Sequence, residues 1–330
     1  MHRARGQNFR YLVRLREPNA RRLVETRRIF GTLNTPVVVI VVLIVVAAID
    51  GFLFFRDHSP RRRVLVVAAG DIADCGSKGD EATARLVEGI DDGATVLAVG
   101  DLAYQHGTAK EYAECYDPTW GRFKERTRPI PGNHDYGTKG AKAYFDYFGD
   151  AAGDPQKGYY SYDLGSWHLV ALNSICKQIG GCGRGSAELE WLKRDLASNL
   201  ARRCTLAYVH DPLFSAGRDA NSLKVTHIYK ALYAAGVDVV LSGDYHNYQR
   251  FEPQDPDGNA DHERGIRQFV VGTGGRDHYA IESPIENLEV YNDDTYGVLK
   301  LTLEEGGYEW RFVPVEGETF TDSGSARCNP

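Results

Sequence analysis

Most apolar residues of this chain are grouped in short runs that stop at glycine or polar residues. Two of these runs, "RVLVVAAGD" and "TVLAVGD", both end in Gly-Asp, and a helix is expected between them. This order predicts a βαβ unit. Three later runs, "CTLAYVHDP", "VDVVLSGD" and "RQFVVGTGG", also end at turn residues. Each of these runs predicts a further β-strand.

Two segments alternate between apolar and polar residues and predict hairpins. "GYYSYDLGSWHLVALNS" would turn at 164–166, and "YGVLKLTLEEGGYEWRFVPV" would turn at 304–307. Between them, leucines recur at three- and four-residue steps and predict a helix over 187–200. Mixed strands and helices of this kind imply sheets that pack together and are covered by helices.

One apolar run is too long to be a strand. Residues 37–55, "VVVIVVLIVVAAIDGFLFF", contain one charge in nineteen positions and as a helix would extend about 28 Å, close to the thickness of the hydrocarbon core of a bilayer. The preceding tail is too long for the n-region of a signal peptide, and no A-x-A site follows. We therefore expect an uncleaved single-pass anchor over residues 36–55.

Charge is distributed unevenly around this run. Residues 1–63 carry thirteen Arg, no Lys and four acidic residues, a net charge of +9, so the remainder must carry −15 to give the −6 of the whole chain. Nine Arg precede the run and four follow it. The positive-inside bias therefore predicts a cytoplasmic tail (1–35), a basic linker (56–63) and an extracytoplasmic domain (64–330). The expected partner of the anchor is the lipid bilayer, and the acidic domain argues against nucleic acid as a partner.

All six cysteines lie in the predicted extracytoplasmic domain. An even number of cysteines in an oxidising compartment indicates disulfides. The sequence contains no C-x-x-C pair, which would have favoured a zinc site. Several pairings are formally possible. The expected pairs are Cys176 with Cys182 around a Gly-rich loop, Cys204 with Cys328, and Cys75 with Cys115.

Residue types that bind metals recur where the predicted strands end. A single Gly-Asp after a strand is often only a turn or a helix cap, and a single His is often only a hydrogen-bonding group. Five successive strand ends with such groups are harder to explain in that way, because binding groups collect at strand ends in α/β sheets. The residues are Asp71, Asp101, Tyr104, Asn133, His134, His210, Asp244 and His246.

The order of these motifs, GD, GDxxY, GNHD, VH and GxxH, resembles the calcineurin-like metallophosphoesterases, and the Tyr104 position is most similar to the purple acid phosphatase branch. The resemblance covers nearly all of residues 64–330. It implies an α/β (α+β) fold, a four-layer αββα sandwich of two mixed sheets flanked by helices. It also implies a dinuclear metal centre at the strand ends and hydrolysis of phosphomonoesters by in-line attack of a metal-bound hydroxide.

By the same resemblance, Asp71, Tyr104 and His246 would bind the first metal, and Asp101 would bridge both metals. The carboxylates and the phenolate are hard, anionic oxygen donors, which favour a trivalent ion. We therefore expect Fe(III) at this site, and an Fe(III)–phenolate pair would colour the protein. His134 would be catalytic, stabilising the phosphoryl oxygens or protonating the leaving group.

The second metal site departs from the family pattern. Its ligands by resemblance are Asn133, His210 and the residue at position 244, where the family usually has His and this chain has Asp. A carboxylate can coordinate at roughly 2.0–2.2 Å if the loop lets it reach, and it shifts the preference towards harder ions such as Mn. The alternative is that Asp244 binds through water and holds the metal loosely. Fe(II), Zn or Mn is the expected ion.

Two further residues are candidates for contact with substrate. Asp211 would disfavour polyanionic substrates if it lines the pocket, whereas the alternative is an outward turn residue before Pro212. His278, beside the Gly-rich "VGTGG", is expected at the rim. His168 is expected to pack within a strand. The remaining histidines of the domain that the sequence places on the surface are His106, His227 and His262.

The leading interpretation is a membrane-anchored extracytoplasmic phosphatase that acts on a small phosphomonoester. Hydrolysis of phosphodiesters or nucleotides is a related alternative, because the same metal pair serves both reactions. The rival is a weakened metal-binding envelope module, since Asp244 replaces a ligand His. Against this rival, six of the seven ligand positions match the family pattern. The sequence contains no G-x-S-x-G motif, so it does not indicate serine hydrolase chemistry.

Overall fold

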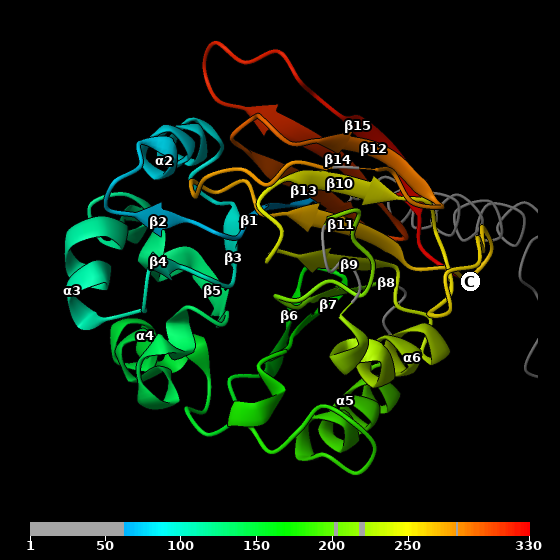
Figure 1. Ribbon diagram of the computed structural model, residues 1–330. Helices are drawn as coiled ribbons and strands as arrows, with labels where there is room; N and C mark the ends of the chain where they lie inside the picture. Colours follow the sequence, from blue (N-terminus) through cyan, green and yellow to red (C-terminus); the bar gives the residue numbers. More distant parts are fainter. Residues whose placement is uncertain (1–62, 201–203, 218–221, 282) are drawn as a thin grey trace, which may run out of the picture. The chain divides into compact units, whose positions relative to one another are not determined.

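The computed structural model describes residues 63–200, 204–217, 222–281 and 283–330, and the strands within them form two large β-sheets (Figure 1). The first sheet has the order β15-β14-β13-β1-β3-β5, and the second has the order β12-β10-β11-β9-β8-β7-β6. A third, two-stranded sheet pairs β2 (Ala73–Asp74) with β4 (Ala103–Tyr104).

The first sheet consists of β1 (Val64–Ala69), β3 (Thr95–Val99), β5 (Thr127–Ile130), β13 (Gly297–Glu304), β14 (Gly307–Pro314) and β15 (Ser323–Arg327). The second consists of β6 (Tyr160–Leu164), β7 (Trp167–Ala171), β8 (Cys204–Tyr208), β9 (Val239–Ser242), β10 (Tyr248–Phe251), β11 (Arg267–Val271) and β12 (Leu288–Asn292). The α-helices of the described residues are α2 (Gly79–Gly89), α3 (Ala109–Glu111), α4 (Lys142–Phe148), α5 (Ala187–Ser198) and α6 (Thr226–Ala234).

The layers follow from the alternation of side chains along each strand. In β1, Val66 and Ala68 face the second sheet and pack in one core with residues such as Leu206 of β8. Val67 faces the other way, into a core shared with α2 and α4. The outer face of the second sheet packs in a third core against α5 and α6. The described domain therefore has helices outside both of its packed sheets, as the resemblance implied (Figure 1).

Most of the predicted elements are confirmed. The βαβ unit is β1-α2-β3, with parallel pairing between its two strands. The two hairpins are β6-β7 and β13-β14, each antiparallel and turning where the sequence predicted. The predicted helix is α5, which begins at the Ser186 N-cap, whose side chain accepts a hydrogen bond from the backbone N–H of Leu189. His168 is buried in β7, where its two ring nitrogens meet Asp163 and Asp195.

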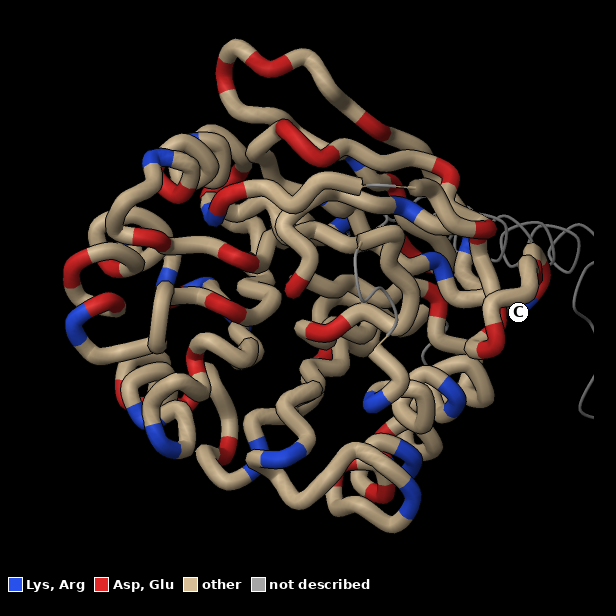
Figure 2. The backbone as a smooth tube through the Cα atoms, viewed as in Figure 1, with Lys and Arg blue, Asp and Glu red and all other residues tan. Residues whose placement is uncertain are grey.

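The predicted membrane segment lies outside the described residues. No helix in residues 63–200, 204–217, 222–281 or 283–330 is long and apolar enough to cross a bilayer. The expected tail (1–35), anchor (36–55) and all of the linker except Arg63 belong to the part of the chain that the structure does not describe. Figure 2 shows the acidic character of the described domain, with Asp and Glu positions along both helical layers and the loops.

All three expected disulfides are present. They join Cys75 to Cys115, Cys176 to Cys182, and Cys204 to Cys328, with sequence separations of 40, 6 and 124. Cys75 and Cys115 tie the segment after β2 to the helical segment that follows α3. The Cys204–Cys328 bond links the start of β8 to the segment after β15, so it joins the two sheets.

We expect the loss of the Cys204–Cys328 disulfide to destabilise the fold more than the loss of Cys176–Cys182. A crosslink restricts the unfolded chain more when it closes a longer loop, and the loop-entropy relation gives about 5 kcal/mol against about 2 kcal/mol for these separations. Urea unfolding of the two paired Cys→Ala variants would measure this order. Equal losses, or a larger loss for the short loop, would contradict it.

Candidate metal centre

The predicted ligands lie together because strand ends from both sheets meet. The backbone N–H of Gly70, after β1, donates to the carbonyl of Val271 at the end of β11 at 3.0 Å, and these strands belong to different sheets. Around this junction, the ligand atoms of Asp71, Asp101 and His210 all lie within 4.8 Å of one another, and all three side chains are buried.

Tyr104 and His246 complete the first half of the cluster. The Tyr104 hydroxyl lies 2.9 Å from Asp71 Oδ1 and 3.2 Å from both Asp101 Oδ2 and His246 Nε2. His246 Nε2 is also 3.5 Å from Asp71 Oδ1. Four potential ligands therefore converge where the first metal was predicted.

His210 and Asp244 form the second half of the cluster. His210 Nε2 is 3.4 Å from Asp101 Oδ2 and 3.7 Å from Asp244 Oδ1. It is buried and makes no hydrogen bond to the described residues. The Asp244 carboxylate, with 30% of its side chain exposed, faces the same pocket as Asn133. Asp244 thus lies beside His210, and its direct ligation of a second metal stays a prediction.

The orientation of both imidazoles fits metal binding. His210 Nδ1 is 2.9 Å from the carbonyl of Val99, and His246 Nδ1 is 2.6 Å from the carbonyl of Asp277. Because a carbonyl can only accept, Nδ1 must be the donor in both rings. This arrangement leaves Nε2 to face the carboxylates, as in histidines that bind metals through Nε2.

His134 lies beside the cluster rather than within it. Its backbone N–H donates to Asp101 Oδ1 at 2.8 Å, and its Nδ1 donates to the carbonyl of Gln105 at 2.6 Å. Its Nε2 is 3.8 Å from Asp101 Oδ2. The ring therefore lies at the edge of the pocket, as a group that contacts substrate should.

The electrostatics of the metal-free cluster favour a cation. Burial raises the pKa of Asp71 and of Tyr104 well above their ordinary values, and it raises the pKa of Asp244 to about 6. Burial opposes the ionisation of Asp101, yet the charge of the nearby His210 ring lowers the pKa of Asp101. Burial lowers the pKa of His246 to about 4, which keeps this ring neutral as a ligand. Crowded buried carboxylates of this kind are stabilised by a bound cation.

Backbone conformation explains why glycine precedes the acidic ligands. Asp71, Asp101 and Asp244 have positive φ angles of 57°, 52° and 67°, a region that Asp tolerates better than most residues. At Gly100 an added Cβ would collide with the His210 ring, and at Gly243 it would lie 2.7 Å from Asp71 Oδ2. The GD motifs therefore bring the backbone close enough for ligands from different strands to meet.

Two supporting features were missed by the sequence analysis. Asp135 is fully buried and accepts hydrogen bonds from the backbone N–H groups of Leu102 and Gly132 and from the Tyr112 hydroxyl. It thereby joins the loops after β3 and β5, and burial raises its pKa to about 6. Its place in the GNHD motif was a signal for this role.

The second feature is the loop after β11, which braces the first half of the cluster. The Arg276 backbone N–H donates to the Asp71 carbonyl at 2.9 Å, and its guanidinium lies 5.0 Å from the centre of the Tyr104 ring. The Tyr279 ring stacks on His246 with 3.9 Å between centroids. The Gly-rich sequence of this loop suggested only that His278 lies at the rim.

His278 and Asp211 lie in different surroundings. His278 lines the pocket and packs against Tyr296, 4.2 Å between ring centroids. Asp211 is buried, accepts a hydrogen bond from Ser174 Oγ at 2.6 Å and pairs with Lys224 Nζ at 2.6 Å. It does not lie on the pocket lining, and it is not an outward turn residue. Contact of either residue with substrate stays a prediction.

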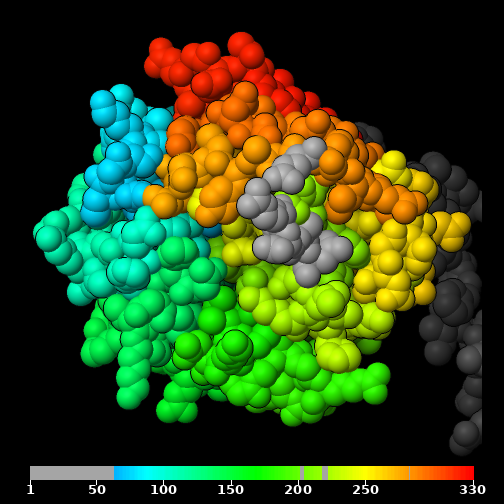
Figure 3. All heavy atoms as spheres, in the orientation of Figure 1, coloured from blue at the N-terminus to red at the C-terminus, as the bar shows by residue number. Residues whose placement is uncertain are grey.

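The pocket over the cluster has a volume of about 550 Å³. Its lining comprises Asp101, Asn133, His134, Gly217, Asp244, Tyr245, His246, His278, Tyr279 and Ala280. Figure 3 shows all heavy atoms of the domain in the orientation of Figure 1.

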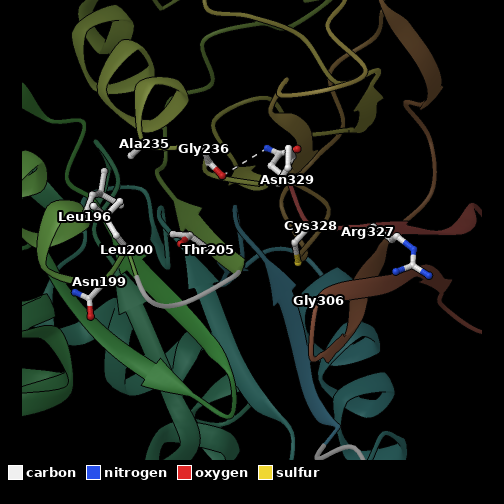
Figure 4. Close-up of a pocket in the computed structure, with 11 residues that line it drawn as sticks. Leu196, Asn199, Leu200, Thr205, Ala235, Gly236, Gly306, Arg327, Cys328 and Asn329 are labelled. Carbon is white, nitrogen blue, oxygen red and sulfur yellow. Dashed lines mark hydrogen bonds between the residues drawn. The ribbon is translucent and has the colours of Figure 1, made fainter.

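A second pocket, of about 360 Å³, lies beside the Cys204–Cys328 disulfide (Figure 4). None of the described residues that line it is Asp, Glu or His. The nearby group of Cys204, Asp238 and Cys328 could suggest a metal site, but its two sulfurs are joined to each other. Asp101, Asp244 and His246 line the first pocket, so the chemistry of the domain is assigned there.

The fold and the cluster define a metal-dependent phosphoesterase domain. The chain belongs to the calcineurin-like phosphoesterase family, whose family model matches residues 53–248. The resemblance inferred from the motifs is thereby confirmed.

Purple acid phosphatases are among its relatives. Over 231 residues the chain is 28% identical to purple acid phosphatase 15 of Arabidopsis thaliana, covering 57% of this chain and 41% of that protein. Over 262 residues it is 26% identical to a nucleotide pyrophosphatase/phosphodiesterase of Hordeum vulgare, covering 67% and 68% of the two chains. Purple acid phosphatase PPD1 from yellow lupin has the same fold, with a TM-score of 0.69, 18% identity, and coverage of 82% of this chain and 55% of that one.

Proposed function

We propose that this protein is an extracytoplasmic phosphatase that hydrolyses phosphomonoesters with a pair of metal ions. The observation that carries the proposal is the place of Asp101 in the cluster: its Oδ2 lies 3.4 Å from His210 Nε2 and 3.2 Å from the Tyr104 hydroxyl, which in turn lies 3.2 Å from His246 Nε2. One buried carboxylate shared by two groups of candidate ligands suits two cations with a bridging ligand.

The donor sets suggest different ions at the two positions. Asp71, Tyr104, His246 and the shared Asp101 would hold Fe(III), because hard anionic oxygens predominate. Asn133, His210, Asp244 and the same Asp101 would hold Fe(II), Zn or Mn. When bound, such a pair polarises the phosphoryl oxygens and lowers the pKa of water.

The protein's own residues would orient the substrate. The hydrogen bond from His134 Nδ1 to the Gln105 carbonyl fixes the ring, so that Nε2 is the atom available to the pocket. When the ring is protonated, Nε2 could donate to a phosphoryl oxygen or give its proton to the departing alcohol oxygen. His134 is therefore proposed as the catalytic residue.

The location is proposed from the sequence, and the three disulfides agree with an oxidising compartment. Residues 36–55 would anchor the chain in the cell membrane, with the N-terminus in the cytoplasm. Fractionation and protease treatment of intact cells or spheroplasts would test this topology. Release of the full-length protein by alkaline carbonate, or protection of the domain from external protease, would contradict it.

The activity can be tested on the purified full-length protein with 4-nitrophenyl phosphate and bis(4-nitrophenyl) phosphate. We expect turnover of the monoester that is lost on chelation and restored by Fe with Zn or Mn. Faster turnover of the diester would favour the phosphodiesterase alternative, which the similarity to the Hordeum vulgare enzyme supports. If neither ester is hydrolysed with any of these metals, the phosphatase proposal is wrong and the weakened metal-binding module becomes the favoured interpretation.

A further inference from the structure

The residues that line the pocket are of two chemical kinds. Some are proposed to bind metals and phosphate, among them Asp101, Asn133 and His134. The others are Gly217, Tyr245, His278, Tyr279 and Ala280, of which three have aromatic rings. A phosphoryl group at the metals would leave much of the 550 Å³ for the rest of the substrate.

Tyr279 is held in place as a flat surface among the second kind of residue. Its ring lies nearly parallel to that of His246, with an angle of 16° and a centroid distance of 3.9 Å. Its backbone N–H donates to the His246 carbonyl at 3.1 Å, and its own carbonyl accepts from Asn247 Nδ2 at 3.0 Å. Tyr279 is nevertheless 45% exposed. One face of the ring is covered by His246, and Tyr279 lines the pocket, so part of its exposed surface is available to an incoming group.

The charges of the pocket limit what that group can be. None of the described residues that line the pocket is Lys or Arg, while Asp101 and Asp244 are both acidic. Beyond the proposed metals, a second or third phosphate would meet no Lys or Arg side chain among the described lining residues. An uncharged group needs no such partner.

We propose that the site selects monophosphate esters whose leaving group carries a flat, uncharged ring that packs on Tyr279. This inference rests on the proposed phosphatase function and narrows its substrate class. A ring fits because aromatic faces stack with their planes offset or meet edge to face, and the tyrosine loses little freedom on binding since its backbone is already fixed. An aryl or benzyl ester and a nucleoside monophosphate share this chemistry.

The contribution of the ring can be measured with two esters of similar leaving-group basicity. Benzyl phosphate has a flat ring, and cyclohexylmethyl phosphate has a puckered ring of similar size. We expect kcat/KM to favour the benzyl ester by roughly 3- to 10-fold, mainly through KM, the range expected for one aromatic pair. The Tyr279→Leu variant should lose this preference, and Tyr279→Phe should keep it.

Tyr291 offers a matched control, because it is 44% exposed and lies on β12, outside the pocket lining. Tyr291→Leu should leave the preference unchanged. Metal content is measured for every variant, because Tyr279 packs on the proposed ligand His246. If the preference for the benzyl ester falls only in proportion to the loss of metal, Tyr279 has no role of its own in substrate selection.

Binding of benzylphosphonate and cyclohexylmethylphosphonate, measured by calorimetry, separates this inference from the proposed function. If no ester is turned over but benzylphosphonate binds more tightly than cyclohexylmethylphosphonate, the phosphatase proposal is wrong and the binding site for a flat ring is retained. Normal turnover with equal binding of both phosphonates would overturn the ring site alone. Comparison of adenosine monophosphate with ribose 5-phosphate asks whether the ring is a nucleobase. Faster turnover of adenosine triphosphate than of the monophosphate would contradict the charge argument.

Discussion

Replacing Asp101 by asparagine is expected to reduce kcat/KM for a phosphomonoester by on the order of 10³-fold or more. Asp101 is the residue shared by both halves of the cluster, since its Oδ2 lies 3.2 Å from the Tyr104 hydroxyl and 3.4 Å from His210 Nε2. The amide keeps the shape and can still accept the backbone N–H of His134, but it removes the negative charge between the two proposed metals. The variant should therefore fold and bind fewer metal ions.

Asp146→Asn is the matched control, because this aspartate lies on α4 with 61% of its side chain exposed, paired with Lys142. It should keep wild-type activity and metal content. Circular dichroism and urea unfolding would confirm that both variants are folded. If Asp101→Asn retained more than about a tenth of the wild-type rate, a bridging role for this residue would be wrong.

The second large effect is expected at Asp244, the residue that departs from the family pattern. Its carboxylate lies 3.7 Å from His210 Nε2 and lines the pocket, so direct ligation of the second metal is within reach. We expect Asp244→Ala to lose about one metal per chain and to lower kcat roughly 10- to 100-fold. We also expect Asp244→His to bind Zn or Fe(II) in preference to Mn, because imidazole is the softer ligand.

Metal titrations of both variants, followed by elemental analysis, would measure these changes. Asp257→Ala is a suitable control, since its side chain is 69% exposed and pairs with Lys230 away from the pocket. Unchanged metal content and rate in Asp244→Ala would show that Asp244 is not a ligand. A large rise in rate in Asp244→His would show that the natural aspartate weakens the enzyme.

The sequence predicted those parts of the fold that depend on local patterns. Within the described residues, the short apolar runs that end in turn residues became strands, and the glycine before Asp71, Asp101 and Asp244 marked the place where the backbone turns. The edge strand β12 was not predicted, because its residues 288–292 are half-buried or exposed and lack an apolar run. The two-residue strands β2 and β4 depend on the pairing of two loops that are distant in the sequence.

The sequence predicted the site residues that directly follow strands. It did not predict the contacts that residues from distant segments make with them. Asp135 was visible within a motif, but its three hydrogen-bond donors come from separate parts of the chain. Asp211 forms an ion pair with Lys224, which belongs to another segment of the chain. No local sequence pattern predicts a contact between these two residues. The stacking of Tyr279 on His246 likewise arises only when the loop after β11 folds over the cluster.

The central claim is that the buried carboxylates, the phenol and the two imidazoles form one site for two metal ions. Its most direct test is the metal content of the purified full-length protein, together with its visible absorption spectrum. We predict two metal ions per chain, one of them iron, and a visible band from the Tyr104 phenolate that Tyr104→Phe abolishes. Less than one metal ion per chain after supplementation with Fe, Zn and Mn would contradict the account.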